Sequence, residues 1–105
     1  MDNRPDERDD AKSKIKVLAE KNSPLLIKTF KLSAPLFCSK LVLRQPKLVR
    51  TELIFCIYLK LNYSTKEIAK FLNVSPKAIQ NRKNRLRKKL NIDSSLDLYQ
   101  WFDSL

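Results

Sequence analysis

The chain has 105 residues and a formal net charge of +11, a length suited to one small domain with a modest core. It contains no glycine and no histidine, so glycine-rich phosphate loops and the most frequent general base are absent, and we expect neither an enzyme nor a cofactor. No apolar run approaches the about 20 residues of a membrane span, no signal peptide precedes the acidic start, and the two isolated cysteines match no zinc-site spacing; we expect a soluble, cytoplasmic protein without metal.

The first ten residues contain five acidic side chains, two arginines and a proline. Such a composition cannot bury enough apolar surface to become ordered, so residues 1–10 are predicted to form a disordered acidic tail. Because this tail has a net charge of −3 (two basic minus five acidic residues), the rest of the chain carries +14.

Residues 11–45 are predicted to form an N-terminal helical extension. Apolar residues three and four apart indicate a first helix over residues 11–22, and Ser23-Pro24 has the pattern of a cap and proline that opens a second. Pro35 interrupts this second helix, and Ser33 can cap a third that ends before the next proline. The extension either braces the core of the following domain or serves as a linker or oligomerisation helix tied to an upstream segment.

The segment 51–61 is almost continuously apolar and could be taken for a buried strand. Its length, Glu52 in the first turn and Asn62 just after its end favour a buried helix instead. Tyr58 is expected near the surface. Both cysteines of the chain are expected to be small buried side chains. The face toward the next two helices is expected to contain Leu53, Cys56, Ile57 and Lys60 or Leu61.

Residues 64–74 predict the first helix and the turn of a helix-turn-helix. Ser64 or Thr65 can cap a helix of about two turns, and Asn73 can adopt the left-handed conformation of a tight helix end. The small Ala69 allows two helices joined by so short a turn to cross closely.

Ser75 and Pro76 open a second helix with a hydroxyl cap and a proline at the first helical position. Between Lys77 and Lys89 this helix has seven basic residues and no acidic residue, a cluster that favours a polyanionic partner. Helical spacing places on its inward face Ile79, Leu86 and Leu90.

The outward face of helix 75–91 supplies the predicted contacts to double-stranded DNA. The N-terminal residues of a recognition helix enter the major groove first, so the expected base contacts are Lys77, Gln80, Asn81 and Asn84. Phosphate contacts position such a helix without reading sequence, and those expected are Ser64, Lys66, Arg82, Arg85, Arg87, Lys88 and Lys89.

A last helix is predicted to follow Ser94, because an acidic residue stands three positions later, as in an N-cap. Its apolar stripe needs a partner surface, which is either the domain's own core or a second copy of the chain. In the second case the interface of a homodimer is formed by Leu98, Trp101, Phe102 and Leu105.

One set of residues resembles a known family. The set consists of Lys66-Glu67-Ile68-Ala69 and Lys89-Leu90 with Leu48, Glu52, Ser64, Leu72, Ser75, Ile79 and Leu86. It is similar to the pattern of the C-terminal DNA-binding domain of LuxR/GerE-type bacterial transcription regulators. Asn62 and Asn73 stand where this family usually has glycine, and Ala78 and Arg82 replace its usual Thr and His, so its DNA contacts carry over only in part.

The resemblance implies an all-α fold, a helix-turn-helix four-helix bundle over residues 46–105 that is preceded by N-terminal helices. It also implies a sequence-specific transcription regulator that is a homodimer on DNA. The segment 30–43 resembles the stretch before this domain in larger regulators, so the chain is a candidate effector end of a longer protein. An upstream sensor domain or RNA polymerase would then be a further partner.

Two other functions stay open. A second resemblance, to the promoter-binding fourth region of sigma factors, rests on Glu67-Ile68-Ala69 with Arg82, Arg85 and Lys88-Lys89, although that family typically ends soon after its basic helix. The third function is a helical interaction module that binds an acidic protein or a lipid surface instead of DNA. The apolar residues of helix 75–91 are committed to a core, which leaves no stripe to insert into lipid.

Overall fold

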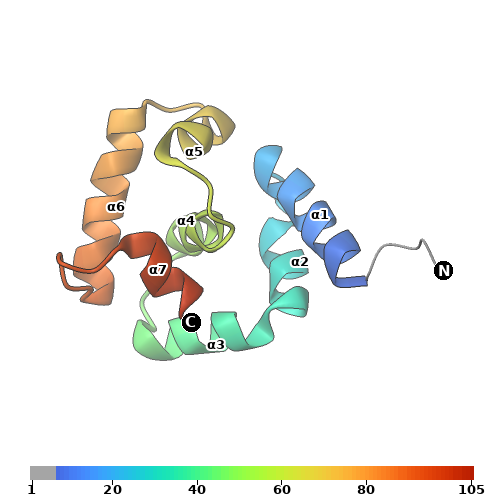
Figure 1. Ribbon diagram of the computed structural model, residues 1–105, viewed down its shortest axis with the longest axis horizontal. Helices are drawn as coiled ribbons and strands as arrows, with labels where there is room; N and C mark the ends of the chain where they lie inside the picture. Colours follow the sequence, from blue (N-terminus) through green and yellow to red (C-terminus); the bar gives the residue numbers. More distant parts are fainter. Residues whose placement is uncertain (1–6) are drawn as a thin grey trace.

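The computed structural model describes residues 7–105, with side chains from residue 11 onward, and within that range the chain forms seven α-helices and no β-strand. The prediction of an all-α fold is confirmed (Figure 1). None of these helices is long and apolar enough to cross a membrane. The helices are α1 (Glu7–Glu20), α2 (Leu26–Ser33), α3 (Pro35–Arg44), α4 (Arg50–Lys60), α5 (Thr65–Leu72), α6 (Pro76–Leu90) and α7 (Leu98–Asp103).

Helix α4 lies at the centre of the molecule, and Figure 1 shows it end-on with α6 and α7 on one side and α1 and α2 on the other. Helix α2 packs against α1, α3 and α4, α4 packs against α7, and α5 packs against α6. Buried apolar side chains from all seven helices belong to one cluster. The three N-terminal helices therefore cover the core of the following helices, which is the packing expected of a brace.

The prediction that Tyr58 lies near the surface is wrong. Its side chain is fully buried in α4, and its hydroxyl donates a hydrogen bond to the carbonyl oxygen of Ala19 in α1 at 2.6 Å. The reason is that α1 closes the face of α4 that an isolated four-helix bundle would leave open. Cys38 and Cys56 are both buried, as predicted, and burial raises the pKa of the Cys56 thiol to about 12.

Three predicted helix starts near the N-terminus differ from the structure. Helix α1 begins at Glu7, inside the stretch predicted as a disordered tail, while residues 1–6 lie outside the described part of the chain. Helix α2 does not begin at Ser23-Pro24, because the Ser23 hydroxyl accepts the N–H of Leu25 at 3.2 Å in a turn ahead of the helix. Pro35 does separate α2 from α3, but Ala34 is the residue before α3 and no side chain caps it.

Helix α7 begins later than predicted. Asp97, not Ser94, is its N-cap, and the Asp97 carboxylate accepts the N–H of Gln100 at 3.0 Å. The Asp93 carboxylate accepts the N–H of Ser95 at 2.8 Å. This local bond competes with helix formation and keeps the segment between α6 and α7 in a turn.

Candidate nucleic-acid interface

Helix α5 begins with a reciprocal pair of hydrogen bonds. The Ser64 hydroxyl accepts the N–H of Glu67 at 3.1 Å, and the Glu67 carboxylate accepts the N–H of Ser64 at 3.0 Å. Two N–H groups that the helix leaves unpaired are thereby satisfied, and the same bonds lower the pKa of Glu67. The predicted cap at Ser64 is confirmed.

The turn between α5 and α6 also follows the prediction. Asn73 ends α5 with φ 55° and ψ 48°, a left-handed conformation, and the Ser75 hydroxyl caps α6 by accepting the N–H of Ala78 at 3.1 Å. Pro76 then occupies the first helical position, where its missing N–H costs nothing. Local hydrogen bonds and Pro76 thus define where α6 begins.

One face of α6 is fixed against the core. Its buried residues are Ile79, Leu86 and Leu90, as predicted, together with Lys83. Since α6 has 15 residues, it is about 22 Å long and can lie along a DNA groove.

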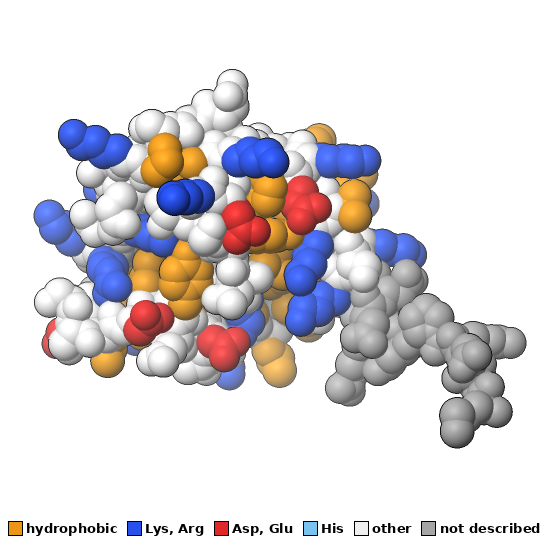
Figure 2. All heavy atoms as spheres, turned by 45° about the horizontal axis from the view of Figure 1, so that its top comes forward, with side chains coloured by type: hydrophobic (Ala, Val, Ile, Leu, Met, Phe, Trp, Pro, Cys, Tyr) orange, Lys and Arg blue, Asp and Glu red, His pale blue; other side chains and the backbone are white. Residues whose placement is uncertain are grey.

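The four predicted base contacts share the opposite, exposed face. Gln80 donates a hydrogen bond from its side-chain amide to the side-chain oxygen of Asn84 at 3.4 Å, which places the two one turn apart on the same face. In Figure 2, Lys and Arg side chains project from the side of the molecule where α6 lies. The exposed set is Lys77, Gln80, Asn81 and Asn84.

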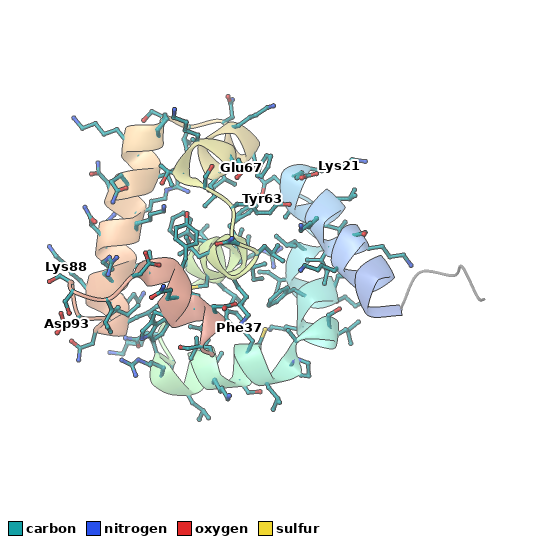
Figure 3. All side chains as sticks on the ribbon, in the orientation of Figure 1. Lys21, Phe37, Tyr63, Glu67, Lys88 and Asp93 are labelled. Carbon is teal, nitrogen blue, oxygen red and sulfur yellow. The ribbon has the colours of Figure 1, made fainter. Side chains whose placement is uncertain are left out.

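The predicted phosphate contacts divide into two groups. Lys88 points outward from α6, away from α4, as Figure 3 shows. Together with Lys88, the other exposed basic side chains of the predicted set are Lys66, Arg82 and Arg85. Ser64 is exposed as well, but its hydroxyl is already used as the cap of α5.

Arg87 and Lys89 instead bind other parts of the same chain. The Arg87 guanidinium donates to the carbonyl oxygens of Leu96 at 2.9 Å and Asp93 at 3.4 Å, which holds the segment before α7. The Lys89 ammonium lies 2.6 Å from the Glu52 carboxylate in α4. These contacts occupy part of the donor capacity of each side chain.

The residues predicted as a dimer interface pack largely within the chain. Leu98 and Phe102 are buried in the core, and the Phe102 ring centroid lies 6.4 Å from that of Phe37 in α3. Trp101 and Leu105 are half-buried, and the guanidinium of Arg44 lies 5.2 Å from the centroid of the Trp101 ring. The apolar stripe of α7 thus finds its partner surface in the core of its own chain.

Sequence reasoning missed the role of Lys83. Its ammonium donates to the hydroxyl of Thr65 at 2.6 Å and to that of Tyr99 at 2.8 Å. A signal was present, because Lys83 stands four residues after Ile79 and three before Leu86, which is the spacing of the inward face.

Residues 58–102 match the sequence model of a family described as "Bacterial regulatory proteins, luxR family". The match begins in the second half of α4 and includes the whole of α5 and α6. No curated protein and no solved structure matches the chain.

Proposed function

We propose that the chain is a sequence-specific transcription regulator with α6 in the major groove, because residues 58–102 match the LuxR family of bacterial regulatory proteins and contain the helix-turn-helix. The observation that carries this proposal is the exposed face of α6. It combines amide and ammonium side chains near the N-terminal end with basic side chains farther along.

Base reading would fall to the first part of this face. Gln80, Asn81 and Asn84 can each pair with adenine through a side-chain amide, and Lys77 can donate to guanine. The hydrogen bond between Gln80 and Asn84 is long, at 3.4 Å. When DNA binds, it would break and both side chains would turn toward the bases. Because the carboxamides stand on two successive turns of α6, they would contact neighbouring base pairs.

Phosphate binding would use the exposed basic side chains. None of Arg82, Arg85 and Lys88 makes a hydrogen bond or ion pair with the part of the chain whose side chains are described, residues 11–105, so binding DNA would break no such contact of theirs. Lys66, at the start of α5, extends the positive surface to the first helix of the motif.

Salt dependence tests this proposal quantitatively. If Arg82, Arg85, Lys88 and Lys66 each neutralise one phosphate, the logarithm of the affinity should fall against the logarithm of salt concentration with a slope of about −3.6 per chain. A slope of about −6 would mean that Lys83, Arg87 and Lys89 bind phosphates as well. Fluorescence anisotropy on a labelled duplex measures the slope, and no binding at low salt would refute the DNA-binding function.

We further propose that two chains bind as a homodimer and that the protein acts in the cytoplasm, where bacterial DNA lies. The half-buried Trp101 and Leu105 are the members of the predicted interface that keep surface for a partner. An upstream sensor domain and RNA polymerase fit the same proposal as partners of a regulator. The family match favours this function over the sigma-factor-like alternative.

A further inference from the structure

Lys83 is the one basic residue of α6 that the structure buries, with 8% of its surface exposed, although it stands in the middle of the basic run. Its ammonium donates to the hydroxyl oxygens of Thr65 at 2.6 Å and Tyr99 at 2.8 Å. The same ammonium lies 4.6 Å from the centroid of the Tyr99 ring, a proximity that accompanies the hydrogen bond to that side chain. Lys83 is therefore turned away from the surface that would meet DNA.

These contacts join four segments of the chain. Thr65 is the first residue of α5, Lys83 lies in the middle of α6, and Tyr99 is the second residue of α7. The Tyr99 hydroxyl also donates to the carbonyl oxygen of Tyr63, in the loop after α4, at 2.6 Å. The cluster thus ties both helices of the helix-turn-helix to α7 through directional bonds.

An apolar residue would fill this position at lower cost. Burial lowers the pKa of Lys83, the nearby charge of Arg87 lowers it further, and Asp97 acts in the opposite direction. Both acceptors of the ammonium are uncharged hydroxyl groups, so they compensate only part of the cost of removing a charge from water. Hydrogen bonds depend on direction more strongly than apolar packing does. They therefore favour one rotation of α6 about its own axis over slightly different rotations.

The rotation of α6 determines where its base-reading side chains lie. Asn81 stands two residues before Lys83, which is about 160° around a helix of 3.6 residues per turn. Rotating α6 by about 10° would move a side chain about 6 Å from the axis by about 1 Å. Such a displacement is enough to disrupt a bidentate hydrogen bond to a base.

We propose that Lys83 is a positioning residue: with Thr65 and Tyr99 it sets the rotation of α6 against α5 and α7, and so determines sequence preference without touching DNA. This inference rests on the proposed function. It predicts a separation between two quantities, the preference for one sequence and the number of phosphates bound.

The test compares Lys83→Met, which keeps the apolar stem and removes the ammonium, with the matched control Lys88→Met on the exposed face. Affinities of the full chain for a selected duplex and a random duplex are measured over a range of salt. We expect Lys83→Met to leave the salt slope unchanged and to reduce the ratio of the two affinities at least about tenfold, whereas Lys88→Met should reduce the slope by about 1 and keep the ratio.

A slope that falls by about 1 in Lys83→Met would show that Lys83 binds a phosphate, and an unchanged ratio would show that it does not position the helix; either result overturns the inference. If Lys83→Met does not fold, Tyr99→Phe keeps the ring, loses the hydroxyl, and should show the same loss of preference at an unchanged slope.

A measurement without DNA separates failure of this inference from failure of the proposed function. The urea midpoints of Lys83→Met, Tyr99→Phe and the double variant form a double-mutant cycle. We expect a double-variant shift smaller than the sum of the single shifts, because each single variant leaves one buried partner unsatisfied. Additive shifts would overturn the positioning cluster itself. If the two substitutions are coupled but the chain binds no duplex, the cluster exists and the proposed function is refuted, together with the positioning role in DNA reading.

Discussion

The basic side chains of α6 have different roles because they lie on different faces of one helix. Lys88 faces solvent, Lys83 faces the start of α5 and α7, and Arg87 and Lys89 reach neighbouring segments. Residue type alone does not distinguish these roles. Only the exposed group has donors none of which is already used by a contact within the described residues.

The pair formed by Lys89 and Glu52 leads to a prediction about pH. Burial raises the pKa of Glu52, but the hydrogen bonds from Lys89 and from the N–H of Val49 and the charge of Lys89 outweigh burial, so the pKa lies below its ordinary value of 4.5. A lowered carboxyl pKa stabilises the folded state above the ordinary value, and this contribution is lost as the pH falls through the lowered one.

We therefore expect Glu52→Gln to lower the free energy of unfolding at pH 7 by less than about 1 kcal/mol, since the pair is partly exposed. Urea denaturation at pH 7 and at a series of acidic pH values should show that this difference between variant and parent shrinks as the pH falls below the ordinary pKa of Glu52 and through the lowered one. A difference of the same size at every pH would mean that the Glu52 charge contributes nothing.

At the scale of the elements, asparagine occupies the left-handed positions after helices that are most often occupied by glycine. The chain has no glycine, and the described residues with positive φ are Asn22, Asn62, Asn73 and Asn91. Each follows the end of a helix, where a left-handed residue lets the chain reverse within one or two residues. The short connection between α5 and α6 depends on one of them.

Substitution of Asn73 tests this requirement. Asn73→Ala should lower the free energy of unfolding by about 1–2 kcal/mol, because a Cβ without a compensating polar group is unfavourable in the left-handed region. Asn73→Gly should be neutral or slightly stabilising. Asn84→Ala, at an exposed position inside α6, is the control and should change stability by less than about 0.5 kcal/mol. Equal effects of Ala and Gly at position 73 would contradict the account of the turn.

The elements also show what could be predicted from sequence. The caps at Ser64 and Ser75 and the left-handed Asn73 were predictable because their partners lie within three residues. Burial of Tyr58 and the pairing of Lys89 were not, because the partners Ala19 and Glu52 lie 39 and 37 residues away. Sequence reasoning therefore placed helix α6 correctly, but it could not tell which of the basic residues of α6 are exposed and which contact the rest of the chain.

At the scale of the whole molecule, the N-terminal helices support α6 directly. The side chains of Arg44 and Gln45, at the end of α3, donate to the carbonyl oxygens of Leu90 at 3.3 Å and Lys89 at 2.9 Å. These carbonyls belong to the last turn of α6, which has no helical partners for them. Loosening α3 should therefore also loosen the far end of the helix that is proposed to enter DNA.

Substitution of two neighbouring residues of α3 tests whether this helix is part of the core or only a loosely attached linker. Phe37 is 4% exposed and points toward α7, as Figure 3 shows, whereas Leu36 is 73% exposed. Phe37→Ala should lower the free energy of unfolding by about 3–5 kcal/mol, and Leu36→Ala by less than about 0.5 kcal/mol. If both variants denature in urea like the parent, α3 does not share the core of α4 and α7.

The central claim is that the exposed face of α6 reads a DNA sequence, and selection of bound duplexes from a random pool tests it most directly. We predict that the parent chain enriches one motif, present as two inverted half-sites if two chains bind together. Selection with Asn81→Ala should change the preferred base at one position of each half-site and leave the rest of the motif intact. A pool that shows no enrichment, or a motif that Asn81→Ala leaves unchanged, would contradict the claim.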